Sequence, residues 1–388
     1  MKQFILFIIV LVLLAPTSLA CASNESCSEL LTESWNTYKS FFIQSDGRVI
    51  DYRSNNSTTS EGQSYALLRA VWENDKETFD NVLSWSNRNL KVRGDELFGW
   101  EWGKKDSGEW ILLDKSSATD ADQDIAIALI LAYDKWNDEK YLDQAKKLIN
   151  NIWKELIIEI KGNYYVTAGE WAKQEDNVKL NPSYLSPYAY RMFAKYDKNN
   201  DWLKLVDSSY EVLNQTSELT VFYLPPNWAY INKNTGKLSI DKEVNAKDSD
   251  YSYDAIRTQW RISLDYLLYG DKRALKYIEK STNYLIKYWE INKVLPASIT
   301  ADGVIRELNG SNAIYGANLP AIALVNPQIA REIYHKKLAS EYVKGFWGDP
   351  KDYYAQNIIW FGVALWTNID NKDNPLSKRG LVNLINEK

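Results

Sequence analysis

Two kinds of helical segment alternate along most of the chain. Residues 120–137 contain an unbroken apolar run from Ile125 to Tyr133, which is apolar on every side of a helix. Residues 138–157 instead carry their apolar side chains on one face, at Leu142, Ala145, Leu148, Ile149 and Ile152. A helix that is apolar all round must be buried, whereas a helix with one apolar face belongs at the surface of a domain.

The same pattern and its end signals predict twelve helices. They lie at 27–43, 61–74, 76–88, 120–137, 138–157, 183–197, 199–214, 251–269, 271–289, 315–325, 327–344 and 353–367. The third and ninth of them resemble the fifth, with one apolar face formed by Phe79, Val82 and Leu83 in the third and by Leu275, Ile278 and Leu285 in the ninth. We therefore expect the even-numbered helices inside the molecule and the odd-numbered ones around them.

The connections between these helices also alternate. An even helix passes to the next odd helix through one or a few residues, such as Asn137 or Gly270, while the reverse connections are long, at 44–60, 89–119, 158–182, 215–250 and 290–314. This alternation predicts an all-α fold, an (α/α)6 barrel of six helical hairpins with its long loops on one rim. Strands are expected only at 157–160 and 164–167, as one hairpin around Gly162-Asn163. Because no linker rich in Pro, Gly or Ser divides the chain, residues 23–388 should form a single domain.

Residues 1–22 have the features of a signal peptide. Lys2 precedes an apolar run too short to span a membrane, and small residues at Ala20 and Ala22 offer cleavage sites. We therefore expect export, to a secreted or periplasmic location, with no stable membrane span. An alternative is a lipid anchor at Cys21. The other cysteine is Cys27, so no disulfide can connect distant parts of the fold.

Composition narrows the possible chemistry. The net charge is −5 and the Lys and Arg residues form no run, which argues against a nucleic-acid partner. The single histidine, His335, excludes a site with several histidine ligands and disfavours a Ser-His-Asp mechanism, so no metal or cofactor is expected. Trp 16 and Tyr 26 are high counts, and those outside the core suit stacking on sugar rings. Catalysis must then come from Asp, Glu, Tyr or Arg.

Acidic residues open three of the inner helices. Glu61 follows Ser60, where a structural interpretation is a capping box with Gln63. Asp120 and two more acids follow Thr119, which with Asp122 also fits a capping box. Asp254 and Arg257 are three residues apart on the eighth helix and could form an ordinary surface ion pair, or Arg257 could hold Asp254 ionised and oriented. Together they place carboxylates on one rim of one barrel, which favours a catalytic site.

Several segments resemble glycoside hydrolase family 8. They are Ser60-Glu61-Gly62-Gln63, Ala118-Thr119-Asp120-Ala121-Asp122 with Ile125-Ala126, Tyr253-Asp254-Ala255 with Arg257, and Asn181-Pro182-Ser183-Tyr184. Leu224-Pro225-Pro226-Asn227-Trp228 is also similar, although the family often has Asp where this chain has Asn227. The resemblance spans roughly residues 30–370 and implies an (α/α)6 barrel that hydrolyses β-1,4-linked glycans with inversion.

The resemblance also implies roles for single residues. Glu61 resembles the general acid, Asp254 the general base, and Asp120 the acid that grips the distorted sugar beside the scissile bond. Tyr184 and Arg257 resemble supporting residues. Trp100 resembles a stacking platform, and Trp171 is a second candidate for that role. An acid at a helix N-terminus tends to stay ionised, so burial or the nearby Asp120 must raise the pKa of Glu61 for it to hold a proton.

We therefore expect a secreted, monomeric, inverting endo-β-1,4-glucanase acting on cellulose-like polysaccharides or oligosaccharides. The same chemistry on xylan, xylo-oligosaccharides, chitosan or mixed-linkage β-glucan remains open. A non-catalytic glycan-binding barrel is an alternative of another class. A polysaccharide lyase or sugar epimerase is a third, disfavoured because the one histidine is poorly placed.

Overall fold

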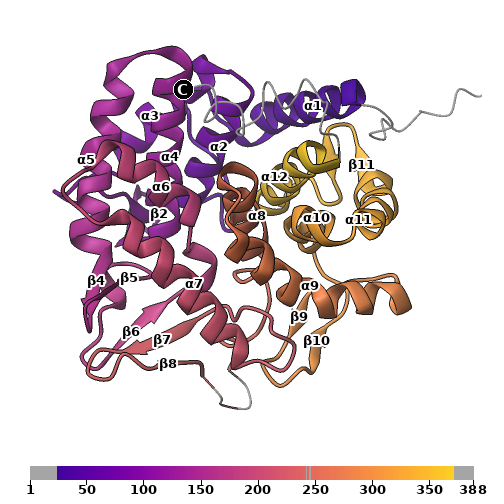
Figure 1. The fold of residues 1–388 in the computed structure, drawn as a ribbon. Helices are drawn as coiled ribbons and strands as arrows, with labels where there is room; N and C mark the ends of the chain where they lie inside the picture. The colour runs from indigo at the N-terminus through magenta and orange to yellow at the C-terminus, as the bar shows by residue number, and fades with distance from the viewer. Residues whose placement is uncertain (1–23, 242, 244–245, 371–388) are drawn as a thin grey trace, which may run out of the picture.

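The computed structural model of the protein describes residues 24–241, 243 and 246–370, and helices dominate it (Figure 1). The signal peptide and Cys21 lie outside the described residues. The helices of the described part are α1 Asn24–Phe42, α2 Ser60–Trp72, α3 Lys76–Asn89, α4 Thr119–Trp136, α5 Glu139–Leu156, α6 Pro187–Tyr196, α7 Trp202–Glu218, α8 Arg257–Tyr269, α9 Lys272–Asn292, α10 Ala313–Val325, α11 Pro327–Ile333 and α12 Tyr353–Asp370. Each expected helix has a counterpart among them.

The even-numbered helices form a closed inner ring. Helix α2 packs against α4, α4 against α6, α6 against α8, α8 against α10, α10 against α12, and α12 returns to α2. Helices α3, α5, α7, α9 and α11 each pack outside the inner helix that precedes them, and α1 packs against α12. This arrangement confirms the all-α (α/α)6 barrel.

Burial separates the two rings as the sequence pattern predicts. Every residue of α4 from Thr119 to Ala132 is buried, and so is α10 from Ala313 to Ala323. In α5 the buried positions include Leu142, Ala145 and Ile152 on one face, with exposed lysines and asparagines between them. The inner helices therefore form the hydrophobic core, and the outer helices cover it with one apolar face each.

Three predicted helix ends are wrong. Helix α8 begins at Arg257 instead of residue 251, so Asp254 lies in the turn that leads into the helix. Helix α6 begins at Pro187, because a proline is favoured in a first helical turn, and a separate 3-10 turn covers Pro182–Tyr184. Helix α11 ends at Ile333 and continues as a π turn at Tyr334–Leu338, which shortens the predicted 327–344 helix.

The expectation of a single β-hairpin is also wrong. The predicted pair exists as β4 Ile157–Ile160 and β5 Asn163–Val166, but the other long loops contain further short strands. These strands are β1 Thr58–Thr59, β2 Gly99–Lys104, β3 Trp110–Ser117, β6 Asn177–Leu180, β7 Ala229–Asn232, β8 Leu238–Ser239, β9 Ser298–Ile299, β10 Ile305–Glu307, β11 Tyr342–Val343 and β12 Phe346–Trp347. Some pairings join loops far apart in sequence, such as β6 with β7, which no local pattern reveals.

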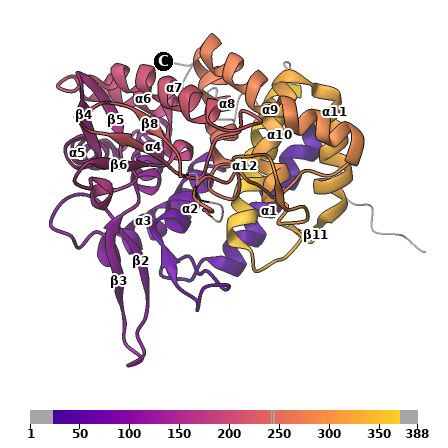
Figure 2. The same ribbon diagram turned by 90° about the horizontal axis from the view of Figure 1, so that it is seen from below.

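The longest hairpin, β2–β3, projects from the barrel (Figure 2). Arg48 packs against this hairpin, with its guanidinium 4.5 Å from the ring centre of Trp102 and 4.3 Å from that of Trp110. The two indole rings stack on each other at 4.8 Å. Within the described residues, each helix is too short or too polar to cross a membrane.

Candidate active site

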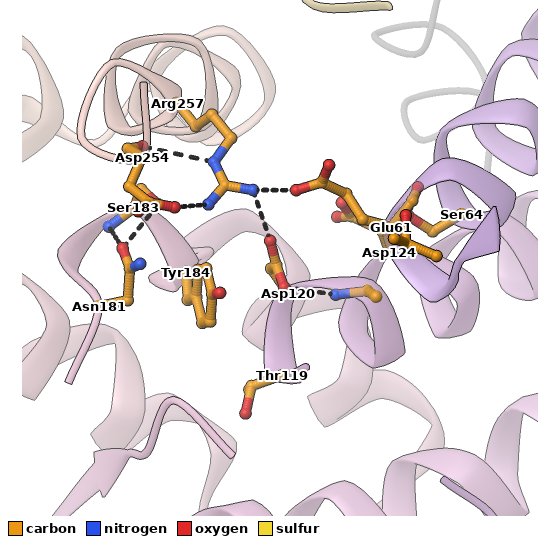
Figure 3. A network of polar contacts seen from close by, with 12 residues as sticks. Glu61, Ser64, Thr119, Asp120, Asp124, Asn181, Ser183, Tyr184, Asp254 and Arg257 are labelled. Carbon is orange, nitrogen blue, oxygen red and sulfur yellow. Dashed lines mark hydrogen bonds and ion pairs between the residues drawn. The ribbon is translucent and has the colours of Figure 1, made fainter. Parts of the chain in front are cut away.

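Arg257, the first residue of α8, is the centre of the site. Its Nη1 donates to Glu61 Oε2 and, at 2.8 Å, to Asp120 Oδ2, while its Nη2 donates to Asp254 Oδ1 at 2.6 Å. Only 3% of the arginine side chain is exposed. The three carboxylates named from the sequence therefore meet on one buried guanidinium (Figure 3). Asp254 and Arg257 do form an ion pair, but the arginine is buried and is shared with Glu61 and Asp120. The pair is therefore not an ordinary surface ion pair.

Glu61 occupies the first turn of α2, but the capping box that was the alternative structural interpretation of this segment does not form. Thr59 caps the helix by accepting from the backbone N–H of Gly62 at 3.0 Å. The Gln63 amide turns inward, where it accepts from the Val49 N–H and donates to Ser86 Oγ. Glu61 is thereby left to point into the cleft, and Tyr353 donates to its Oε1 at 3.2 Å.

The acids that open α4 have separate roles. Asp120 has a side chain that is 3% exposed, binds Arg257, and accepts from the Ala121 N–H at 3.0 Å. The capping box that Thr119 and Asp122 could also have formed is absent. Thr119 donates to the Thr167 carbonyl, and Asp122 accepts from the Phe98 N–H, because the neighbouring loops pack against this helix end.

Asp254 is held by the turn that precedes α8. Asn227 accepts from the N–H groups of Ser252 and Ala255, at 3.3 and 3.0 Å, on either side of Asp254 in sequence. The Asn227 amide donates to the Lys247 carbonyl and to Ser252 Oγ, which an aspartate could not do. The departure from the resembled motif at residue 227 is thus compatible with a well-ordered turn.

The environment gives two of the carboxyl groups unusual proton affinities. Burial is the largest cause that raises the pKa of Glu61, Arg257 opposes it, and Asp120 and Asp254 add to it, so that the pKa reaches about 7. Burial also raises the pKa of Asp254, and Arg257 counteracts this. At neutral pH Glu61 can therefore carry a proton, although 19% of its side chain is exposed at the cleft. The pKa of Glu61 is thus raised despite its position at a helix N-terminus, which by itself favours the ionised carboxylate.

Aromatic side chains line the cleft above these carboxylates. The cleft has a volume of about 550 Å³ and is lined by Glu61, Asp254, Arg257, Tyr184, Trp100, Trp171, Trp228 and Tyr353, among others. Trp100 and Trp171 are 42% and 43% exposed, so each presents a flat ring to a ligand. Tyr184 lies over Arg257, with the guanidinium 5.3 Å from its ring centre. All the candidate binding residues expected from the sequence therefore border one cleft.

Some residues at the site were not expected. Tyr353 opens α12 and binds both Glu61 and the capping Thr59. Trp228 packs edge-on against Tyr184 at 6.1 Å. The position of Tyr353 at the start of an inner helix was a usable signal, since the other site residues share it. Its phenol carries no charge, however, and so did not stand out as the acids did.

A second ion pair lies one helical turn below the first. Arg261 of α8 binds Asp124 of α4 with both terminal nitrogens, each at 2.6 Å, and both side chains are at most 1% exposed. It repeats the Asp120–Arg257 contact four residues further along each helix. In the part of the chain that the structure describes, no group of three or more His, Cys, Asp or Glu side chains could hold a metal ion.

Comparison with known proteins agrees with this geometry. Endoglucanase 2 of Ruminiclostridium josui is 29% identical over 321 residues, covering 76% of this chain and 66% of that protein. Endoglucanase C of Ruminiclostridium cellulolyticum is 32% identical over 269 residues, covering 66% of this chain and 54% of that protein. The matches thus span between about half and two thirds of these relatives' length.

Solved structures show the same fold. The crystal structure of the endo-1,4-D-glucanase from Vibrio fischeri ES114 superposes with a TM-score of 0.70 at 26% identity, covering 86% of this chain and 94% of that one. Residues 6–368 match the glycosyl hydrolases family 8. The fold is an (α/α)6 barrel, and carboxylates lie where its inner helices begin. Because the family match also covers nearly the whole sequence, the chain belongs to glycosyl hydrolase family 8.

Proposed function

We propose that this chain is a secreted, inverting endo-β-1,4-glucanase that acts as a monomer on cellulose-like glucans. The observation that carries the proposal is the pair of carboxyl groups on Arg257. Glu61 can hold a proton near neutral pH, and Asp254 lies on the other side of the same guanidinium (Figure 3). Inverting glycosidases need such a pair, one acid and one base, set apart to leave room for water.

In this mechanism Glu61 is the general acid. Its Oε2 accepts from the charged Arg257 and its Oε1 from the neutral Tyr353 hydroxyl at 3.2 Å, so the proton belongs on Oε1, whose partner is uncharged. The proton passes to the glycosidic oxygen as the bond between that oxygen and the anomeric carbon breaks. Glu61 leaves this step as a carboxylate, which Arg257 then stabilises as its nearest cation.

Asp254 is the general base. It takes a proton from a water molecule as the water oxygen bonds to the anomeric carbon, on the face opposite the departing oxygen. Arg257 keeps the Asp254 carboxylate ionised for this task. Asp120, buried and bound to the same guanidinium, is positioned to bind a hydroxyl of the distorted sugar and to stabilise positive charge that develops on its ring.

The surrounding surface supports a polymeric substrate. Trp100 and Trp171 offer exposed rings for pyranose faces in the cleft that Glu61 also lines. A second cavity of about 810 Å³ adjoins the cleft and shares Asp51 and Tyr353 with it. A glucan chain could thus continue past the carboxylates in both directions, which favours cleavage within the chain. Both relatives described above are named endoglucanases.

Export rests on residues 1–22, which we propose to be a cleaved signal peptide, with a lipid anchor at Cys21 as the variant of this proposal. Mass spectrometry of the mature protein from its own host distinguishes the two. A free N-terminus after a small residue supports secretion. A diacylglycerol modification at Cys21 supports anchoring instead.

The function is tested by a product profile on oligomers of cellulose, xylan and chitosan. We expect internal cleavage of cellohexaose and weaker or no cleavage of the other two. Glu61→Gln and Asp254→Asn should each abolish most of the activity while the circular dichroism spectrum stays unchanged. Glu77→Gln is the matched control, because Glu77 is the first-turn acid of α3 at the surface.

Three outcomes would contradict the proposal. Full activity in Glu61→Gln or Asp254→Asn would remove the assigned roles. Preferred cleavage of xylan or chitosan oligomers would show that the same mechanism acts on a glycan other than cellulose. Binding of cellohexaose without any product would indicate a non-catalytic glycan-binding barrel.

A further inference from the structure

One buried polar group beside the carboxylates has no partner at ordinary hydrogen-bond geometry. Asn181 caps the 3-10 turn at Pro182–Tyr184 and is 2% exposed. Its amide nitrogen, Nδ2, is buried and makes no hydrogen bond of ordinary geometry within the described residues. A buried donor left unpaired is destabilising, so such a group calls for an explanation in function or in a nearby acceptor.

The orientation of this amide is fixed by its neighbour. The Asn181 oxygen accepts from the backbone N–H of Ser183 at 3.0 Å and from Ser183 Oγ at 2.7 Å. A backbone N–H can only donate, so the oxygen must face Ser183 and the nitrogen must face away from it. The unpaired Nδ2 is therefore a true donor position and does not result from a reversed amide.

The acceptor within reach is the Asp254 carboxylate. Figure 3 shows Asn181 and Ser183 beside Asp254, on the side of that residue away from Glu61. Arg257 binds Asp254 Oδ1, which leaves Oδ2 with capacity for further donors. As a hydrogen-bond donor close to Asp254, the Asn181 side chain lowers the pKa of the Asp254 carboxyl, against the larger opposing effect of burial.

We propose that Asn181 is a positioning residue for the general base: in the working enzyme its Nδ2 donates a hydrogen bond to the Asp254 carboxylate. This inference rests on the function proposed above and adds a residue to it. Arg257 and Asn181 then hold the carboxylate from two directions, so that one lone pair of Oδ2 stays directed at the attacking water. The bond also favours the ionised form of Asp254, which is the form a general base needs.

Other groups also act on Asp254 and must be kept constant. The charged and titratable side chains that face it are Arg257, Asp120, Glu61, Tyr184 and Tyr354. None of them contributes the neutral donor that Asn181 supplies. Asn181→Ala therefore removes this donor, together with the two bonds that Asn181 accepts from Ser183, while the charged groups around Asp254 stay as they are.

The test compares three variants. Asn181→Ala removes the donor. Asn181→Asp keeps an acceptor for Ser183, and so preserves the turn, but replaces the donor with negative charge next to Asp254. Ser183→Ala is the control, because the Ser183 backbone N–H still orients the Asn181 amide. We measure the pH dependence of kcat and KM, and the titration of the Asp254 carboxyl carbon by NMR, assigned by its loss in Asp254→Asn.

Since Asn181 lowers the pKa of Asp254, its removal should raise it. In Asn181→Ala the NMR midpoint and the acidic limb of kcat/KM should both move to higher pH, and further in Asn181→Asp. We expect kcat to fall about tenfold in Asn181→Ala with KM changed much less, as for loss of a charge-assisted hydrogen bond. Ser183→Ala should behave like the unmodified protein.

An unshifted Asp254 midpoint in both Asn181 variants would overturn the inference, and so would a loss of thermal stability with unchanged kcat. The NMR titration needs no turnover. It can therefore fail while the proposed function holds, and it can succeed even if the function proves to be another.

Discussion

At the scale of single residues, the proton affinity of Glu61 decides whether the site can work. A carboxyl in the first turn of a helix is stabilised in its ionised form by the helix dipole, by about 0.3–1 kcal/mol. Burial and two neighbouring carboxylates act in the opposite sense and prevail, since the pKa of Glu61 is about 7. The same placement that is ordinary on an outer helix gives Glu61, at the mouth of the barrel, the proton affinity that the proposed general acid needs.

This pKa predicts the alkaline limb of activity. The proposed mechanism requires protonated Glu61, so kcat/KM should fall as the pH rises through about 7. Glu61→Gln should lower kcat by about 100- to 10,000-fold and remove that limb from the residual activity. A pH profile measured with cellohexaose checks both. An alkaline limb that persists in Glu61→Gln at the same pH would show that another group is the acid.

The raised pKa also links stability to pH. An unfolded glutamate titrates near 4.5, so the folded protein binds the extra proton between that pH and about 7. The stabilisation associated with this proton is complete below pH 4.5 and is lost as the pH rises through 7. Glu61→Gln, which cannot ionise, should therefore gain Tm relative to the unmodified protein as the pH is raised from 5 to 8. Equal Tm differences at both pH values would contradict this linkage.

Some contacts between single residues of the site could be predicted from the sequence, and others could not. The spacing of Asp254 and Arg257 predicted their contact, because residues three apart are neighbours on one helical turn. The bonds from Arg257 to Glu61 and Asp120 join residues 196 and 137 positions apart, which no local spacing encodes. Asn181 and Tyr353 were missed as site partners because neither is charged.

At the scale of elements, two ion pairs join α4 to α8, which are not adjacent in the inner ring. The Asp124–Arg261 pair is buried and lies below the Asp120–Arg257 pair of the site. Its role in this view is to fix the height and rotation of the two helices relative to each other. With the two helices fixed in this way, Asp120 of α4 and Arg257 of α8 lie within hydrogen-bond distance of each other.

Breaking this lower pair should be costly. Arg261→Leu leaves Asp124 buried without its partner, which predicts a loss of about 3–5 kcal/mol in the free energy of unfolding. The double variant Asp124→Leu with Arg261→Leu should recover part of that loss, because no unpaired charge remains. Lys336→Met, which breaks an exposed pair with Glu332, is the control and should have a much smaller effect. Urea unfolding measures all three, and a double variant no better than Arg261→Leu would contradict the account.

The β2–β3 hairpin supports Trp100 at the edge of the cleft, and Arg48 fixes that hairpin through the rings of Trp102 and Trp110. Arg48→Ala should loosen the hairpin and raise KM for cello-oligosaccharides by about fivefold, equivalent to one cation–π contact, with a smaller change in kcat. Lys104→Ala on the same hairpin, at an exposed position, is the control. An unchanged KM in Arg48→Ala would show that the hairpin does not help to bind substrate.

At the scale of the whole molecule, the pattern of buried and half-buried helices was sufficient to predict the barrel. Helices that are apolar all round, such as α4 and α10, have no stable place except an inner ring. The loops were harder to predict, because their strands are short and pair with distant loops, as β1 does with β2 and β6 with β7. Those loops build the walls of the cleft, so substrate preference is the property least accessible from sequence.

The stereochemistry of hydrolysis tests the proposed mechanism as a whole. Glu61 and Asp254 acting on opposite faces of the sugar must invert the anomeric centre, so cleavage of a β-1,4-glucan releases an α-anomer first. Proton NMR of cellohexaose during the first minutes of reaction, before mutarotation, resolves the two anomers. We predict that the α-anomer signal grows first and the β-anomer follows by mutarotation. Initial accumulation of the β-anomer would show retention and contradict the roles assigned to Glu61 and Asp254.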